Sequence, residues 1–250
     1  LHDGGPLEWP DCQAPGKSWF HRDIASHLRL AQQDLAQLKQ VLIETLAGHG
    51  AQWIDFQDDG VGNPYLYEVN GRPETNANLR NTFYFSLLKH YVSMEQHASF
   101  MDLGGGYGEF AARIAAANPA ASITFLDLPR MVCVASYLMP RRPMLQGRTG
   151  NLLFLMPWHL PSFRGPVDVV VNTMSFQHMN EANLRFYFSR FRDLGVKQVF
   201  SVNREQGVRE GEAPAYGEVL KRYGYTLEVR KDLRPWRGAH FLNVWSVVHA

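Results

Sequence analysis

The sequence predicts an α/β fold, a doubly wound and mostly parallel sheet preceded by a helical N-terminal cap. Three observations support this. Beyond residue 97, short apolar segments of strand length alternate with helix-length segments. One apolar segment, 167–171, is almost wholly hydrophobic, as expected for a parallel strand covered on both faces. A glycine-rich turn at 104–108 lies between a strand and a helix, where such sheets bind ligands.

The N-terminal region is expected to be helical and irregular. Residues 1–20 are rich in glycine and proline, which predicts a loop. Between residues 24 and 46, apolar side chains recur every three or four positions, which predicts an amphipathic helix ending at Gly48. Residues 57–73 contain several turn signals, and a second helix is expected to begin near Thr75.

The remainder of the chain is expected to form the sheet. The expected strands are 98–103, 122–126, 167–171, 198–202, 225–230 and 241–248. The expected helices are 109–117, 131–138, 183–191 and 215–223. The last two strands have no long helix between them, which predicts one antiparallel strand near an edge. We therefore expect two parts, an N-terminal cap over 1–96 and a sheet domain over 97–250.

Composition limits the choice of partners. The 25 lysines and arginines nearly balance the 24 acidic residues, which argues against nucleic acid or an anionic membrane as the main partner. Apolar runs are too short to span a bilayer, and no secretory signal is evident. Cys12 and Cys133 are expected to be free thiols in the reducing cytoplasm. A small-molecule ligand is the expected partner, and a homodimer is an open alternative.

The glycine turn shows which kind of ligand to expect. Glycines at 104, 106 and 108 allow a sharp turn and let a ligand approach the backbone without meeting a Cβ atom. A dinucleotide-binding fingerprint counted from Gly104 would need glycine at position 109, where this chain has Glu109. An NAD-dependent oxidoreductase is therefore the disfavoured alternative. The pattern is instead acid-x-Gly-x-Gly-x-Gly, beginning at Asp102.

Two further positions fit a nucleoside ligand. Asp127 directly follows the segment 122–126, and an acid at the end of the second strand can accept hydrogen bonds from both ribose hydroxyls. Asn151, in the sequence Gly-Asn-Leu at 150–152, can accept a hydrogen bond from an adenine amino group through its side-chain carbonyl. A plain turn is the alternative for this second position.

The acid-x-Gly-x-Gly-x-Gly pattern resembles the first motif of class I S-adenosyl-L-methionine (SAM)-dependent methyltransferases, which have a Rossmann-like fold. The segments 104–108, 127–129, 172–179 and 201–204 are also similar to a bacterial family described as sugar O-methyltransferases. That resemblance covers roughly residues 60–250. It implies SAM as the cofactor and in-line O-methylation of a small hydroxylated acceptor, either a sugar or a natural-product intermediate.

The resemblance and the strand ends together give the expected cofactor contacts. These are Asp102, Gly104, Gly105, Gly106, Asp127, Leu128, Asn151, Leu152, Asn172 and Arg80. Arg80 would reach the SAM carboxylate from the second predicted helix. No carboxylate cluster follows the expected strand 167–171, so we expect no metal ion.

Three residues are candidates for catalysis at the carboxyl ends of the expected strands 167–171 and 198–202. His178 is the first candidate for a general base, because an unperturbed histidine titrates at about 6.5, close to neutral pH. The similar family often has an acidic residue at this position. Glu205 is an alternative base, and Asn203 can orient the acceptor. An N-methyltransferase acting on a small natural-product amine and a non-catalytic SAM-binding domain are the remaining alternatives.

Overall fold

The computed structural model describes residues 19–64, 66–146, 151–204, 215–233 and 240–247, with side chains from residue 33 onward. Seven strands form one sheet in the order β5-β4-β3-β6-β7-β9-β8. Their bounds are β3 Ser99–Leu103, β4 Ser122–Leu126, β5 Leu152–Leu155, β6 Val169–Thr173, β7 Gln198–Arg204, β8 Tyr225–Asp232 and β9 His240–Val247. Strands β3 to β7 pair in parallel, whereas β9 is antiparallel to both of its neighbours. The predicted mostly parallel sheet with an antiparallel strand near one edge is confirmed.

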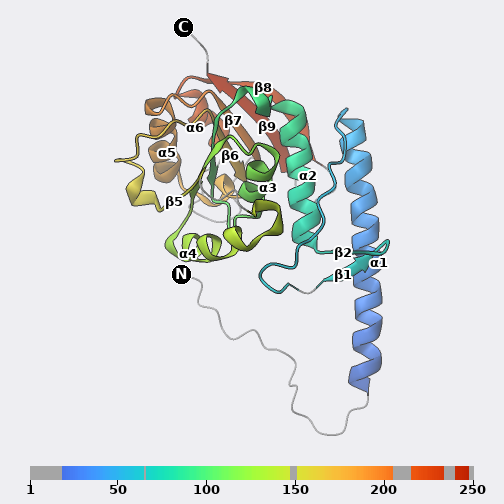
Figure 1. Ribbon diagram of the computed structural model, residues 1–250. Coiled ribbons are helices and arrows are strands. Elements are labelled where there is room, and N and C mark those ends of the chain that lie inside the picture. Colours follow the sequence, from blue (N-terminus) through green and yellow to red (C-terminus); the bar gives the residue numbers. More distant parts are fainter. Residues whose placement is uncertain (1–18, 65, 147–150, 205–214, 234–239, 248–250) are drawn as a thin grey trace.

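Helices cover both faces of the sheet (Figure 1). They are α1 Trp19–Gly48, α2 Asn76–Tyr91, α3 Glu109–Ala117, α4 Pro129–Leu138, α5 Glu181–Asp193 and α6 Tyr216–Lys221. Successive strand residues point to opposite faces. Phe100 and Val171 accordingly pack in the core beneath α1, α2 and α3, whereas Met101 and Val170 pack in the core beneath α5 and α6. This is the doubly wound arrangement that the sequence predicts.

Helix starts follow from local capping. The side chain of Thr75 accepts the backbone N–H of Asn78 (3.0 Å) at the start of α2. Asn180 caps α5 in the same way, accepting the N–H of Asn183 (2.9 Å). Pro129 occupies the first turn of α4, where its missing N–H leaves no hydrogen bond unmade. These three helices therefore begin at positions that the residue type favours.

Two features were not predicted. Strand β5 is only four residues long, too short to show a periodic pattern. The hairpin of β1 Tyr67–Val69 and β2 Arg72–Glu74 lies within the segment 57–73, which we interpreted as turns. Its turn is formed by Asn70 and Gly71, both at positive φ (52° and 75°), as the Asn-Gly pair favours. Strand β6 also begins two residues later than expected.

The cap and the sheet share a hydrophobic core. Leu42 and Leu46 of α1, Phe83 of α2, Phe100 of β3 and Phe110 of α3 belong to one cluster of buried side chains. This cluster extends across residue 96, where we placed the boundary between two domains. That boundary stays a prediction.

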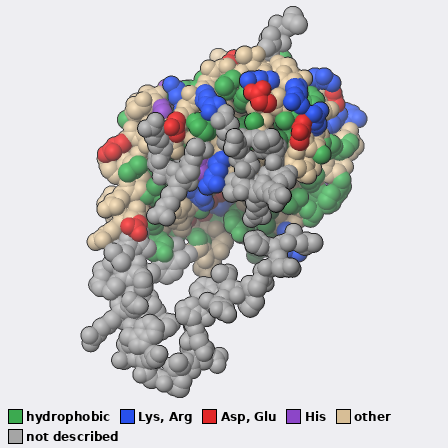
Figure 2. Space-filling view, turned by 180° about the vertical axis from the view of Figure 1, so that it is seen from behind, with side chains coloured by type: hydrophobic (Ala, Val, Ile, Leu, Met, Phe, Trp, Pro, Cys, Tyr) green, Lys and Arg blue, Asp and Glu red, His purple; other side chains and the backbone are tan. Residues whose placement is uncertain are grey.

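Surface charge, helix hydrophobicity and the cysteines bear on the expected partners and location. Figure 2 shows basic and acidic side chains lying near one another on the face seen from behind. Within the described residues, no helix combines the length and the apolar character needed to cross a membrane. Cys133 is an exposed, free thiol on α4, whereas Cys12 lies outside the described residues.

Candidate functional site

The glycine turn joins β3 to α3 and is bonded to the end of β4. The backbone N–H of Gly104 donates to the carbonyl of Leu126 (2.8 Å). The N–H of Gly108 donates to the carbonyl of Gly105 (3.0 Å) and closes a tight turn. Gly104, Gly106 and Gly108 all have positive φ, a conformation that residues with a Cβ rarely adopt. The turn therefore depends on glycine at alternate positions.

The glycines of this turn face different surroundings. A Cβ atom on Gly104 would collide with the side chain of Ser175, and one on Gly105 would collide with the carboxylate of Asp102. Packing therefore requires glycine at both positions. At Gly106, where φ is 60°, a Cβ atom would meet nothing within 4 Å. Gly106 thus faces open space, where a ligand can lie against the backbone.

Asp127 is fixed beside the turn by two backbone hydrogen bonds. Its Oδ2 accepts the N–H of Gly106 (2.8 Å), and its Oδ1 accepts the N–H of Leu128 (2.6 Å). An ionised carboxylate has about four acceptor sites, so sites remain for the hydroxyls of a ligand. Partial burial raises the pKa of Asp127, and the two backbone N–H groups oppose this shift.

Asp102 lies on β3 beneath the turn and is fully buried. Burial, followed by the negative charge of Asp127, raises the pKa of Asp102 to about 7, whereas the backbone N–H of Ala111 lowers it. Its carboxylate lies against Gly105. The structure therefore places Asp102 under the turn, and the predicted contact with cofactor stays a prediction.

The raised pKa of Asp102 predicts a pH dependence of stability. An unfolded aspartate titrates near pH 4, and folded Asp102 titrates at about 7. Between these values the folded protein binds more protons than the unfolded chain, so stability falls as pH rises from about 4 to about 7 and then levels off. We expect the wild-type melting temperature to fall over this range relative to that of Asp102→Asn. If the melting temperatures of the two proteins changed with pH in the same way, the raised pKa of Asp102 would be contradicted.

A cavity of about 220 Å³ lies at the carboxyl ends of the strands. We call it the carboxyl-edge pocket. Its lining includes Gly104, Asp127, Leu128, Pro157, Ser175 and His178. The structure thus brings the first candidate base together with three of the predicted cofactor-binding residues, from segments far apart in the sequence.

His178 ends the short 3₁₀ helix η6, Phe176–His178, which follows β6. Its side chain is exposed, and its Nε2 lies 3.1 Å from Nε2 of Gln177. The backbone N–H of Arg204 donates to Oε1 of Gln177 (2.8 Å), so the other end of that amide must donate to the imidazole. His178 Nε2 is therefore an acceptor, and the proton of the neutral ring is on Nδ1. Sequence reasoning missed Gln177.

Asn172 and Asn203 lie beneath the carboxyl-edge pocket and are fully buried. Nδ2 of Asn172 donates to the carbonyl of Leu103 (2.7 Å), and Nδ2 of Asn203 donates to Oδ1 of Asn172 (2.9 Å). The N–H of Phe176 also donates to Oδ1 of Asn172 (3.0 Å). These bonds connect β3, β6, β7 and the start of η6. The predicted contacts of both residues with ligand stay predictions.

The structure does not bring Asn151 and Leu152 to this pocket. Nδ2 of Asn151 donates to the carbonyl of Pro119 (3.3 Å), which precedes β4. Leu152 begins β5 and pairs with Ile123 at the start of β4. Both residues therefore lie at the amino edge of the sheet, opposite Asp127. The reason is the unpredicted strand β5, which carries the chain across the sheet and delivers Pro157 to the pocket instead.

Arg80 is on α2 and does not line the carboxyl-edge pocket. Its charge lowers the pKa of Tyr84, which burial nevertheless raises to about 12. Glu205 lies outside the described residues. Among the residues that the structure describes, no three His, Cys, Asp or Glu side chains gather as a metal site would require.

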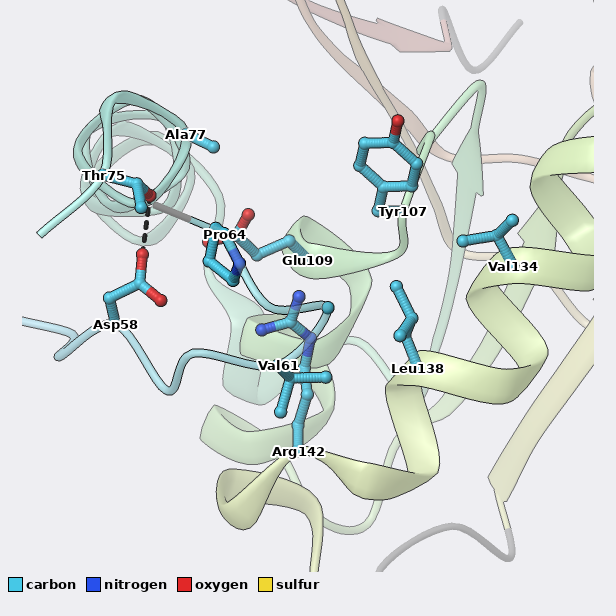
Figure 3. Close-up of a pocket in the computed structure, with 11 residues that line it drawn as sticks. Asp58, Val61, Pro64, Thr75, Ala77, Tyr107, Glu109, Val134, Leu138 and Arg142 are labelled. Carbon is cyan, nitrogen blue, oxygen red and sulfur yellow. Dashed lines mark hydrogen bonds between the residues drawn. The ribbon is translucent and has the colours of Figure 1, made fainter. Parts of the chain in front are cut away.

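A larger cavity of about 460 Å³ lies on the other flank of the glycine turn. We call it the cap pocket, because the loop before α2 forms one of its walls. Figure 3 shows Tyr107, Val134 and Leu138 on one side of it and Asp58 and Thr75 on the other. The glycine turn separates the two cavities, since Gly104 lines one and Tyr107 lines the other.

Comparisons with known proteins agree with this geometry. Residues 75–155, which include the glycine turn and Asp127, match the family model described as an O-methyltransferase domain. Together with the fold, this match supports assignment of the chain to the class I SAM-dependent methyltransferases. The PH0226 protein from Pyrococcus horikoshii OT3 has a similar structure, with 15% identity and a TM-score of 0.55 over 70% of this chain and 92% of that chain. A search of curated proteins found no match.

A second protein of similar structure was solved with a ligand. Magnesium protoporphyrin IX methyltransferase (ChlM) from Synechocystis PCC 6803 with bound SAH is 13% identical, with a TM-score of 0.53 over 70% of this chain and 89% of that chain. The same enzyme with bound SAM is 14% identical, with a TM-score of 0.53 over 78% and 88% of the two chains. These likenesses establish the fold.

SAM is the cofactor that the family match supports, and the residues of the turn fit it. Gly106 offers backbone with open space in front of it. Asp127 keeps acceptor sites for ribose hydroxyls beside that space. Leu128, which is 63% exposed, gives an apolar surface next to Asp127 for the base.

Asp127 should contribute measurably to cofactor affinity. Its replacement by alanine removes an acceptor of charge-assisted hydrogen bonds, a loss of roughly 1.5–3 kcal/mol, or about 10- to 150-fold in Kd for SAM. Isothermal titration of wild type and Asp127→Ala measures this directly. The same titration with Asp193→Ala, an exposed acid at the end of α5, provides the matched control. If Asp127→Ala binds SAM as tightly as the wild type does, Asp127 does not hold the ribose hydroxyls.

Proposed function

We propose that this methyltransferase transfers the methyl group of SAM to a hydroxyl oxygen of a small acceptor, a sugar or a natural-product intermediate. The observation that supports this is the position of His178 in the same pocket as Gly104 and Asp127. A hydroxyl loses its proton on methylation, and an exposed imidazole beside the cofactor site can accept it. The match of residues 75–155 to an O-methyltransferase domain also favours oxygen as the acceptor atom.

The bound cofactor supplies a methyl group that its sulfonium already activates. Asp127 and Gly106 would hold the nucleoside end against the turn. Nε2 of His178 would accept the proton of the acceptor O–H as the new C–O bond forms and the C–S bond breaks. Because Gln177 now donates to this nitrogen, the acceptor hydroxyl must displace that amide. Positioning of the acceptor in line with the methyl group would supply much of the remaining rate.

Two further residues belong to this proposal. Glu205 is the alternative base, and Asn203 would act on the acceptor through η6, because its Oδ1 accepts the N–H of Gln177 (3.4 Å). A cytoplasmic location and a homodimer remain expectations from the sequence.

The experiment uses SAM with a ¹³C-labelled methyl group and matched panels of hydroxylated and amine acceptors. Mass spectrometry detects methylated products, and the ¹³C shift of the new methyl group distinguishes O-methyl from N-methyl. We expect O-methyl products. N-methyl products alone would overturn the oxygen assignment, and SAM binding with no turnover on either panel would favour the non-catalytic alternative.

A further inference from the structure

The cap pocket lies within reach of the proposed reaction centre. Gly104 lines the carboxyl-edge pocket and Tyr107 lines the cap pocket. Three residues of backbone span at most about 11 Å, and the hydrogen bond between Gly108 and Gly105 shortens this further. Gly106, between them, faces open space. A molecule seated in the cap pocket can therefore approach a cofactor that lies against Gly106.

One side of the cap pocket is apolar. Val134 and Leu138 of α4 form it together with the ring of Tyr107, which is 61% exposed. Val61 and Pro64, from the loop before α2, add further apolar surface to the same cavity (Figure 3). Such a cavity, apolar with a few convergent polar groups, is typical of small-molecule sites. It suits the apolar body of a ligand.

The polar side carries an excess of negative charge. Glu109 is paired with Arg113 (2.9 Å). Arg142 is paired with Asp59, both of whose carboxylate oxygens accept from Nη1 (2.8 and 2.9 Å). These two pairs are neutral overall.

Asp58 supplies the excess charge. Uncharged donors hold both of its oxygens: Oδ1 accepts the N–H of Gly60 (3.0 Å) and Oδ2 accepts the hydroxyl of Thr75 (2.6 Å). Its charge is therefore not neutralised by these contacts.

The charge pattern selects a class of ligand. An anion placed here would be repelled by Asp58 at short range in a partly enclosed site, where screening is weak. A hydroxyl group can donate to a carboxylate and accept from a guanidinium. Glu109 and Arg142 present these two kinds of group to the same cavity, and Nε of Arg142 makes no hydrogen bond within the described residues.

We infer that the cap pocket binds the non-reacting part of the acceptor and selects neutral, hydroxyl-rich molecules with an apolar face over anionic ones. This inference rests on the proposed function. It adds a location for the acceptor, a charge rule that disfavours phosphorylated or carboxylated acceptors, and a minimum length, since the acceptor must reach across the glycine turn.

Two probes with the same aromatic ring test the charge rule, namely 4-nitrophenyl β-D-glucoside and 4-nitrophenyl phosphate. Titration calorimetry with SAH present should show the neutral probe binding at least about tenfold more tightly than the phosphate. Asp58→Asn should narrow this difference, because it removes the charge and keeps an acceptor for Thr75. Equal affinities for the two probes, or no binding of the glucoside, would overturn the inference.

Filling the cavity tests the location. Leu138→Trp should weaken glucoside binding by about tenfold or more, and Val134→Trp should do the same if the first variant folds poorly by circular dichroism. Leu153→Trp is the matched control, because Leu153 is exposed on β5 and lines neither cavity. Unchanged glucoside binding in a folded pocket variant would overturn the inference.

The two proposals fail in different ways. Turnover by the wild type with an unchanged acceptor KM in Leu138→Trp would overturn the cap-pocket assignment and leave methyl transfer standing. No SAM binding by the wild type would overturn the proposed function itself.

Discussion

Replacing His178 with alanine should lower kcat by about 10²- to 10⁴-fold and leave the Kd for SAM near the wild-type value. The loss is large because the acceptor proton would then have to leave without a positioned base. Affinity should be preserved because the hydrogen bonds that fix Asp127 and the glycine turn, to which we assign the nucleoside, do not involve the imidazole. Steady-state kinetics and isothermal titration on the same preparation measure both quantities.

The variant His178→Gln separates proton transfer from orientation. A glutamine can donate and accept hydrogen bonds but cannot take the proton, so it should be nearly as slow as alanine. The acidic limb of the wild-type pH–rate profile should also disappear in both variants, because that limb reports protonation of the base. If His178→Gln keeps most of the activity, the imidazole only orients the acceptor, and Glu205 becomes the better candidate.

Gly106→Val should abolish measurable SAM binding while far-UV circular dichroism remains close to that of the wild type. The added side chain would fill the open space beside Asp127. A β-branched residue at a φ of 60° is also strained, which costs of order 1–3 kcal/mol. A fall in melting temperature is therefore expected together with the loss of binding.

Gly195→Val is the matched control for this strain. Gly195 lies between α5 and β7, has a φ of 70°, and would also place a Cβ atom in open space. It should show a similar fall in melting temperature with SAM affinity unchanged. Equal retention of SAM binding in both variants would show that Gly106 serves the turn rather than the cofactor.

The order of strands and helices could be predicted because the signals are local and strong. The bounds of α3 and β4 agree with the sequence prediction, since apolar residues and turn signals define both ends. β5 could not be found in this way. Its four residues carry too few side chains to show alternation, and their pairing with β4 is set by the sheet.

Part of the site could be predicted because the ends of the strands are marked by local sequence signals. Gly104, Asp127 and His178 each follow a strand, and the carboxyl ends of parallel strands meet at one edge, so the strand positions together with the family resemblance predicted that they lie close to one another. Asn151 was expected at the carboxyl edge because strand β5 was not predicted. It lies at the amino edge, just before β5 begins. Gln177 and the cap pocket escaped prediction because they depend on side-chain contacts between distant segments, which no local pattern encodes.

The continuous core shared by α1, α2 and the sheet limits how this enzyme can acquire a new specificity. Exchange of the whole N-terminal region for that of a relative would remove Phe83, which packs in one cluster with Phe100 and Phe110. Such a chimera would lose packing against the sheet as well as binding of the original acceptor. The loop 58–64 contributes Asp58, Val61 and Pro64 to the cap pocket from outside that core. We therefore expect sequence differences between related enzymes to concentrate in this loop, while the sequences of the surrounding helices change less.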